Sequence, residues 1–162
     1  MKRILLSGVL ALAGLAASAQ QLPNPYGPPI NADTARKVAD AAVAEAHKNG
    51  WNMAVAVTDP NGELVFFEKM DTTQMGSVDV SIQKSRSAVR FKRPTKAFQD
   101  ALAAGGVGLR VLRLEGAIPV EGGLPLLIDG KIIGAVGCSG ATSEQDGLAC
   151  KAGADAIAAP PK

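Results

Sequence analysis

Two short turns set strong limits on the fold, because each lies between two runs of apolar residues. Asp129-Gly130 is one of them, and an Asp-Gly pair in this setting strongly indicates a β-hairpin. The other is Asp-Pro-Asn-Gly at 59–62, where Gly62 is free to adopt a positive φ. The predicted strands are 51–58, 63–69, 124–128 and 131–137. Hairpins join antiparallel neighbours, so we expect a mainly antiparallel sheet.

Helices are expected on either side of each hairpin. Asn31 and Ser77 are predicted N-caps, and Thr142 with Gln145 forms a capping box. The predicted helices are 31–49, 77–91, 95–103 and 142–158, while 105–123 is expected to be irregular. The order α-β-β-α-α-β-β-α predicts an α/β chain of the α+β type, in which helices flank one mainly antiparallel sheet.

The N-terminus has the pattern of an export signal. Two basic residues precede an apolar run that ends in Ala17-Ser18-Ala19, which is typical of a cleaved signal peptide and too short to span a bilayer. We therefore expect residues 1–19 to be removed and the mature protein to be periplasmic or secreted. Residues 20–30 are a proline-rich leader, expected to be extended and unpacked. Residues 31–158 are expected to form a single domain.

Charge and hydropathy argue against two classes of partner. The chain has 17 basic and 15 acidic residues, and loss of Lys2 and Arg3 with the signal leaves equal numbers of each. General nucleic-acid binding requires a basic surplus, so it is not expected. No other stretch is long and apolar enough to cross a membrane, so no span is expected in the mature protein. A balanced charge also leaves little repulsion to oppose self-association.

Cys138 and Cys150 are the two cysteines of the chain. In an oxidising compartment they can pair, and a helix that folds back over its strand would bring them within bridging distance. Two buried free thiols are the alternative. The spacing of this pair is not that of a zinc site, and His47 is the one histidine available to join it, so no metal site is assigned.

Six basic residues gather between positions 84 and 96, with no acid among them. They are Lys84, Arg86, Arg90, Lys92, Arg93 and Lys96. Arg86, Arg90 and Arg93 recur at helical spacing and share one stripe. The buried side predicted for the same helix consists of Val78, Ile82, Ser85 and Val89. Arginines in a row suit carboxylates or phosphates, which they bind bidentately. A solvated basic face or a subunit contact is the alternative.

The loop around Glu121 is the second candidate site. Its carboxylate is followed by Gly122 and Gly123, whose backbone amides can face a ligand. In an enzyme, Glu121 would serve as a general base while the arginines hold a substrate carboxylate. The alternative is a tight loop that enters the second hairpin with Glu121 solvated.

Common catalytic motifs do not occur in the sequence. The glycines at 105–108 have no strand before them, so they do not indicate a nucleotide site. Ser139 lies in Gly-Cys-Ser-Gly, which is not the nucleophile elbow. His47 lies near a predicted helix end, where a solvated cation interacts favourably with the helix dipole.

Several blocks in the same order resemble the GlcG/HbpS family over roughly residues 31–158. They are Gly50-Trp51-Asn52, Val57-Thr58-Asp59, Glu68-Lys69-Met70-Asp71, Lys84 to Phe91, Arg93-Pro94-Thr95, Glu121-Gly122-Gly123-Leu124-Pro125 and Ser139-Gly140-Ala141-Thr142-Ser143-Glu144-Gln145-Asp146. The resemblance implies an antiparallel sheet flanked by helices, homo-oligomers, and haem as a ligand or cofactor. The chain departs from the family at Glu63, where many members have histidine.

Haem iron favours His, Met, Cys or Tyr as axial ligands. The chain offers His47, Met53, Met70, Met75 and Tyr26 as candidates, and none lies in a diagnostic setting. Haem binding is therefore implied by the resemblance alone.

Three functions follow as hypotheses. The first is an exported protein that binds haem or another small, carboxylate-bearing anion. Its ligand would pair with Arg86, Arg90 and Arg93, and Glu121, Gly122 and Gly123 would line the pocket. The second is a small enzyme acting on an organic acid or lactone, with Glu121 as general base. The third is a non-catalytic accessory module whose helices assemble subunits.

Overall fold

The computed structural model describes residues 23–158, and the predicted signal peptide lies outside them. The elements in chain order are α1 (Ala32–Lys48), β1 (Ala54–Thr58), β2 (Leu64–Lys69), α2 (Ser77–Phe91), α3 (Lys96–Ala103), the 3-10 helix η1 (Gly106–Arg113), β3 (Gly123–Ile128), β4 (Lys131–Ser139) and α4 (Ser143–Asp155). The α+β class and the predicted order of helices and strands are confirmed. The 3-10 helix is a correction, because the sequence predicted an irregular segment there.

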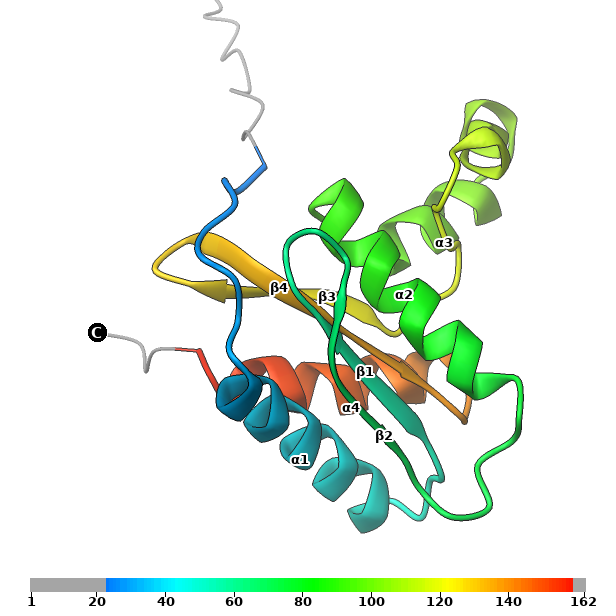
Figure 1. Ribbon diagram of the computed structural model, residues 1–162. Coiled ribbons are helices and arrows are strands. Elements are labelled where there is room, and N and C mark those ends of the chain that lie inside the picture. Colours follow the sequence, from blue (N-terminus) through cyan, green and yellow to red (C-terminus); the bar gives the residue numbers. More distant parts are fainter. Residues whose placement is uncertain (1–22, 159–162) are drawn as a thin grey trace, which may run out of the picture.

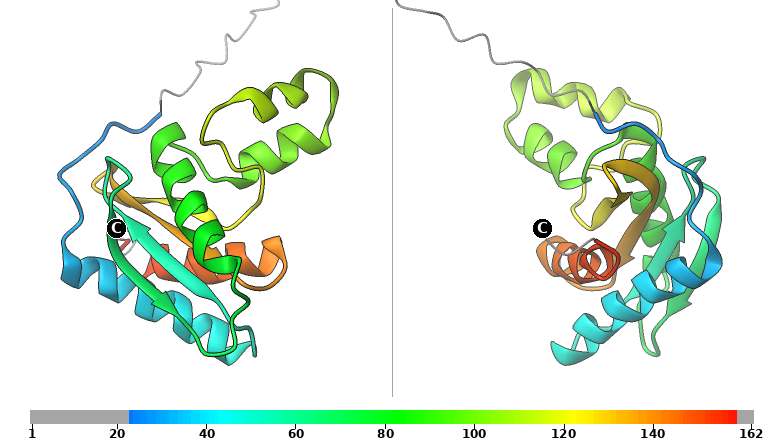
Figure 2. Two further views of the ribbon diagram at one scale, coloured as in Figure 1. Left: turned by 45° about the vertical axis from the view of Figure 1, so that its right-hand side comes forward. Right: turned by 90° about the vertical axis from the view of Figure 1, so that its left-hand side faces the viewer.

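The four strands form one sheet in the order β2-β1-β4-β3, with every neighbouring pair antiparallel. Both predicted hairpins are present, and the central pair β1–β4 joins them with Val57 opposite Val136. Helices α1 and α4 pack together on one face of the sheet, and α2 covers the other (Figures 1 and 2). The chain therefore has three layers, with the 96–113 segment of α3 and η1 extending beyond α2.

The two faces of the sheet carry side chains of different size. Met53, Val55 and Val57 pack with α1 and α4 in the main core. The intervening residues face α2 and are small, so the helix lies very close to the sheet. A Cβ on Gly137 would overlap the backbone carbonyl oxygen of Ser81. Glycine at this position of β4 therefore permits the helix backbone to pack tightly against the sheet.

The buried side of α2 differs from the prediction. Val78 and Ile82 are half-buried. The buried residues of this helix are Ser77, Ser81, Lys84, Ser85, Ser87, Ala88 and Val89. The small sheet residues leave room for serine, and the Ser85 hydroxyl lies 2.7 Å from that of Thr58 and donates to the carbonyl oxygen of Ala135 at 2.9 Å. Ser77 is the first helical residue, and the N-cap is Gly76, which makes no side-chain cap bond.

Local capping signals in the other helices are confirmed. The Asn31 side chain accepts a hydrogen bond from the Thr34 backbone at 2.8 Å. Thr142 and Gln145 form the reciprocal capping box at the start of α4. Both caps satisfy backbone N–H groups that have no partner within their own helix.

The described part of the leader is extended, as predicted, but it is packed against the sheet. Ile132 of β4 donates to the carbonyl oxygen of Pro25 at 2.9 Å and accepts from the backbone of Gly27 at 2.8 Å. Ile30 is buried in the core, and the Tyr26 hydroxyl donates to the Val89 carbonyl oxygen at 2.9 Å. The leader occupies the side of β4 beyond the end of β1, where β4 would otherwise have unpaired backbone groups.

Candidate functional site

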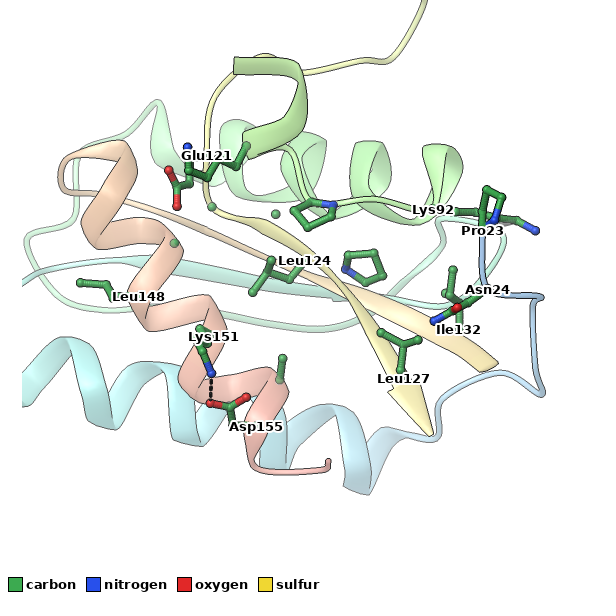
Figure 3. A pocket seen from close by; sticks show the side chains of 17 residues that line it. Pro23, Asn24, Lys92, Glu121, Leu124, Leu127, Ile132, Leu148, Lys151 and Asp155 are labelled. Carbon is green, nitrogen blue, oxygen red and sulfur yellow. Dashed lines mark hydrogen bonds and ion pairs between the residues drawn. The ribbon is translucent and has the colours of Figure 1, made fainter. Parts of the chain in front are cut away.

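A pocket of about 680 Å³ lies between β3, α4 and the connection from α2 to α3 (Figure 3). Its lining comes from six segments. They contribute Pro23 and Asn24, then Lys92, Pro94 and Lys96, then Glu121, Gly122 and Gly123, then Leu124, Pro125 and Leu127, then Ile132, and then Gly147, Leu148, Lys151, Ala154 and Asp155. The volume is within the range of about 300–1,000 Å³ that is usual for small-molecule sites.

The floor of this pocket is apolar, and its edges are charged. Leu124, Pro125 and Leu127 of β3 form the floor opposite Leu148 of α4. Side chains normally alternate between the two faces of a strand. Pro125 and the exposed residues at the end of β3 nevertheless leave apolar surface that faces the pocket. An apolar ligand body gains free energy when it leaves water for such a surface.

Three lysines stand at the edges of the pocket, and they differ in their partners. Lys151 pairs with Asp155 at 2.5 Å and Lys96 with Asp100 at 2.6 Å. The Lys92 ammonium lies 4.2 Å from the centre of the Tyr26 ring and has no carboxylate among the described residues within ion-pair distance. Lys92 is therefore the lysine of the pocket lining that has no internal carboxylate partner among the described residues, and its ammonium extends past Pro23 at the pocket rim, away from Leu124 (Figure 3).

Backbone conformation explains the position of Lys92. Helix α2 ends at Phe91, and Lys92 follows in the left-handed region with φ of 53°. This turn places Lys92 in the pocket wall. Sequence reasoning grouped Lys92 with the basic cluster but did not select it, because spacing along a helix says nothing about a residue just past its end.

Glu121 lies at the α4 side of the pocket, as the binding hypothesis requires. Its backbone N–H donates to the Gln99 side-chain oxygen at 2.8 Å. The carboxylate rests against Gly147, where an added Cβ would lie 2.6 Å from Oε1. Burial raises the pKa of Glu121, and the attraction of Lys96 opposes that shift. Repulsion from Glu144 and Asp100 raises it further. Catalysis by Glu121 stays a prediction.

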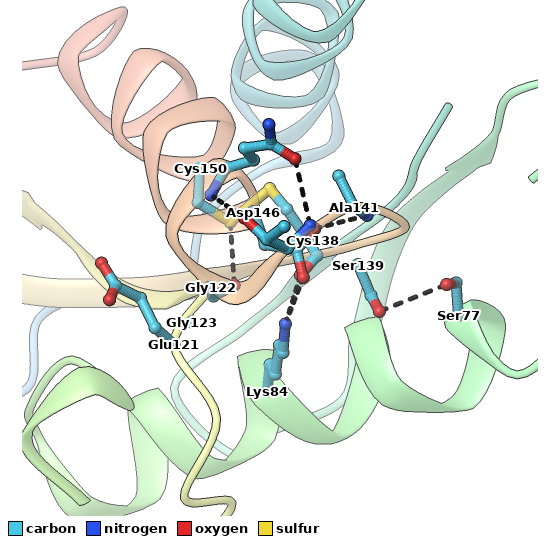
Figure 4. A network of polar contacts seen from close by, with 12 residues as sticks. Ser77, Lys84, Glu121, Gly122, Gly123, Cys138, Ser139, Ala141, Asp146 and Cys150 are labelled. Atoms are coloured by element: carbon cyan, nitrogen blue, oxygen red, sulfur yellow. Dashed lines mark hydrogen bonds and ion pairs between the residues drawn. A yellow bond between two sulfur atoms is a disulfide. The ribbon is translucent and has the colours of Figure 1, made fainter. Parts of the chain in front are cut away.

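Below the loop that carries Glu121 lies a buried ion pair (Figure 4). The Lys84 ammonium donates to Asp146 Oδ2 at 2.7 Å and to the Cys138 carbonyl oxygen at 3.0 Å. Both side chains are at least 96% buried. Burial lowers the pKa of Lys84 and raises the pKa of Asp146, while the attraction within the pair opposes both shifts. The pair joins α2, β4 and α4 behind the pocket.

Gly122 separates this ion pair from the pocket. Its φ is +118°, and a Cβ there would lie 2.8 Å from the Lys84 ammonium and from the Cys138 carbonyl oxygen. Only glycine can adopt this positive φ without strain and also avoid the close contacts of a Cβ atom. Gly122 and Gly123 both belong to the pocket lining, and Gly123 uses its N–H to donate to the Thr95 hydroxyl at 2.9 Å. Ligand binding by these glycines stays a prediction.

Cys138 of β4 and Cys150 of α4 are joined by a disulfide, with their Cα atoms 5.6 Å apart. Both residues are fully buried. The bridge links α4 to the central sheet, next to Asp146 (Figure 4). It therefore supports the α4 wall of the pocket from behind.

The arginine stripe is not part of this pocket. Arg86 and Arg90 line a separate cavity of about 260 Å³ beside the first hairpin turn, and Arg86 Nε donates to the Gly62 carbonyl oxygen at 3.0 Å. The Arg93 guanidinium lies 5.7 Å from the centre of the Phe98 ring. The binding hypothesis assumed that the three arginines and Glu121 share one site. In the structure, the arginines are not part of the lining of the pocket that contains Glu121. A solvated helix face was the alternative, and Arg86 and Arg90 are exposed.

Lys84 also departs from its predicted place. The sequence grouped it with the exposed basic cluster, yet it is 1% exposed. Its partner Asp146 lies 62 residues away in sequence, so no local pattern connects the two. A sign was present, because Lys84 lies at helical spacing from Ser77, Ser81 and Ala88, whose small side chains mark a face suited to close packing.

The candidate haem ligands lie outside the pocket between β3 and α4. Met53 and Met70 are buried in the core and Met75 is exposed, while Tyr26 is in the arginine-lined cavity. His47 borders another hollow with Met70. Within residues 23–158, no three His, Cys, Asp or Glu side chains gather as a metal site would require. The same part of the chain contains no helix long and apolar enough to cross a membrane.

Similarity to known proteins points to one family. A family model described as "Haem degrading protein HbpS-like" matches residues 30–155. Protein GlcG of Escherichia coli K12 is 34% identical over 110 residues, which cover 68% of this chain and 81% of GlcG. A double mutant of Streptomyces reticuli HbpS is 26% identical with a TM-score of 0.74, covering 93% and 99% of the two chains. The PduOC–haem complex, at 24% identity, TM-score 0.71 and coverage of 80% and 95%, shows the same fold.

Proposed function

This chain belongs to the HbpS-like family, and on that premise we propose that it is an exported protein that binds a small anionic ligand. The ligand combines an apolar body with a carboxylate. The site is the pocket between β3 and α4. The observation that carries the proposal is an apolar floor whose lining includes Lys92, a lysine at the rim with no carboxylate partner among the described residues.

The chemistry of the pocket supports this ligand class. Leu124, Pro125 and Leu127 provide apolar contact area, which contributes free energy in proportion to the surface that leaves water. Lys92 can form a charge-assisted hydrogen bond with a carboxylate. Because no carboxylate in residues 23–158 is within ion-pair distance of Lys92, a ligand would not need to displace an internal partner from that range.

Haem is a molecule of this class, since it joins an apolar ring to carboxylates, and both the family description and PduOC concern haem. The pocket suits the ring and the carboxylates. It does not suit the iron, because no His, Met, Cys or Tyr belongs to its described lining. Porphyrin binding in this pocket would therefore depend on the ring and its propionates.

A porphyrin titration tests the proposal. Haemin and metal-free protoporphyrin IX are expected to bind with similar affinity, followed by their Soret absorption bands. Lys92→Gln is expected to weaken both by roughly tenfold, about 1.4 kcal/mol, since it removes the ammonium. Arg86→Gln removes the same charge from the neighbouring cavity and is expected to leave affinity unchanged.

Other outcomes have a definite meaning. Weakening by Arg86→Gln with no effect of Lys92→Gln would place the ligand in the arginine-lined cavity and contradict the proposed site. Binding of haemin alone, lost in His47→Ala, would show iron ligation at the hollow beside Met70. Absence of saturable binding by both porphyrins would exclude haem as the ligand.

The export part of the proposal is supported by the signal-like pattern of residues 1–19 and by the Cys138–Cys150 disulfide, since such bonds persist in oxidising compartments. Intact-mass analysis of protein from the cell envelope fraction tests it. We expect a chain that begins at Gln20, and a full-length mass would contradict it. Self-association, which the family resemblance implies, stays a prediction that light scattering tests, with a monomer mass as the contradicting result.

A further inference from the structure

The pocket between β3 and α4 carries opposite charges at its two ends. Figure 3 shows Glu121 at one end and Lys92 at the other, with Leu124 between them. The pocket is therefore polarised along its length, and the apolar floor connects the two charged groups. A single carboxylate on a ligand would use one end of this pocket only.

The Glu121 end has an acidic surplus. The charged groups that act on Glu121 are Lys96, Glu144, Asp100 and Lys84. Lys96 is held by both carboxylate oxygens of Asp100, at 2.6 and 2.8 Å. Lys84 is balanced by Asp146 below Gly122. Glu121 and Glu144 therefore remain without a neutralising partner among the described residues.

The rest of the pocket does not cancel this asymmetry. Lys151 and Asp155 form a balanced pair along the α4 wall. At the far end, Lys92 faces the Tyr26 ring, which attracts a cation but carries no net charge. The field along the pocket thus runs from a negative end at Glu121 to a positive end at Lys92.

We infer that the ligand is an elongated zwitterion, with an ammonium group at the Glu121 end and a carboxylate at the Lys92 end of an apolar chain. This inference rests on the proposed function and adds the second polar group. It explains why an acidic side chain lies in a pocket that binds an anion. A ligand that places a carboxylate at the Glu121 end as well would meet repulsion there.

Three linear probes of equal chain length test the inference: 8-aminooctanoate, octanoate and octylamine. Calorimetric titration of the mature protein is expected to show 8-aminooctanoate binding roughly tenfold more tightly than octanoate, about 1.4 kcal/mol. Glu121→Gln is expected to remove this preference, because the amino group then has no carboxylate to pair with. Lys92→Gln is expected to weaken both acids and to spare octylamine. Lys37→Gln, on the exposed side of α1, is the charge-matched control.

The outcomes separate the inference from the proposed function. Octanoate binding that depends on Lys92, with no gain from the amino group or with a gain that survives Glu121→Gln, overturns the zwitterion and leaves the anion site in place. Failure of all three probes, and of homologues from six to twelve carbons, overturns both. A preference that disappears as acidic pH protonates Glu121 supports the inference. Because burial raises the pKa of Glu121, that loss begins at a higher pH than for an ordinary glutamate.

Discussion

Lys84→Met is expected to lower the free energy of unfolding by roughly 3–5 kcal/mol, which is typical when one partner of a buried ion pair is removed. The variant leaves the Asp146 carboxylate buried at 4% exposure with its ammonium partner gone. Asp146 keeps the backbone hydrogen bond from Ala141 at 3.1 Å, but that bond does not compensate a whole charge. Urea unfolding at neutral pH measures the effect.

The pH dependence identifies the cause. In the folded variant the pKa of Asp146 lies above its unfolded value, because burial raises it and Lys84 no longer lowers it. The folded state then binds more protons than the unfolded state. The stability of the variant therefore rises as the pH falls toward the pKa of the unfolded carboxyl group. The loss relative to wild type is therefore expected to shrink in acid. A loss that is independent of pH would indicate a packing defect instead.

A surface pair on the next helix is the matched control. Lys96→Met removes one partner of the exposed pair with Asp100. Solvent screens such pairs, so this variant is expected to lose much less stability than Lys84→Met. Replacing both buried partners, in Lys84→Met with Asp146→Leu, is expected to recover part of the lost stability, since no isolated charge remains. If Lys84→Met behaves like Lys96→Met, the buried pair does not stabilise the fold.

Loss of the disulfide is expected to have the second-largest effect. Replacing Cys138 and Cys150 with alanine is expected to lower the free energy of unfolding by about 3 kcal/mol, because the bridge closes a loop of moderate length in the unfolded chain. Oxidised wild type and the double variant are compared by urea unfolding. Because Cys150 fixes α4 to the sheet beside the pocket, the variant is also expected to bind pocket ligands more weakly.

Reducing agent provides the control for this second effect. Dithiothreitol, applied during unfolding so that the buried bond becomes accessible, is expected to lower the midpoint of the wild type and leave the double variant unchanged. Free thiols in the untreated, unfolded wild type would show that the bond does not form in the protein. Equal stability of the oxidised wild type and the double variant would show that the bond forms without stabilising the fold.

Much of the fold was predictable because it depends on interactions between residues close in sequence. Asp129-Gly130 specifies a tight turn through its own backbone conformation, and Thr142 caps α4 through a residue three positions away. Such signals require no knowledge of the remaining chain. They were sufficient for both hairpins, for the order of the elements and for the antiparallel sheet. The shared face of Arg86 and Arg90 on α2 was likewise readable from helical spacing, whereas Arg93 lies beyond the end of the helix.

The composition of the site depended on the tertiary structure. Lys84 is buried because the sheet residues beneath α2 are small, which lets the helix lie close to the sheet. Its partner Asp146 lies 62 positions away in the sequence. Lys92 lines the pocket because the helix ends at Phe91 and the backbone turns there. Arg86 and Arg90 lie within the helix and face the first hairpin turn instead. The sequence alone determined which elements form, since their signals are local. Which charges meet, and which face a ligand, was decided only when distant segments packed together, because burial and pairing are properties of the whole fold.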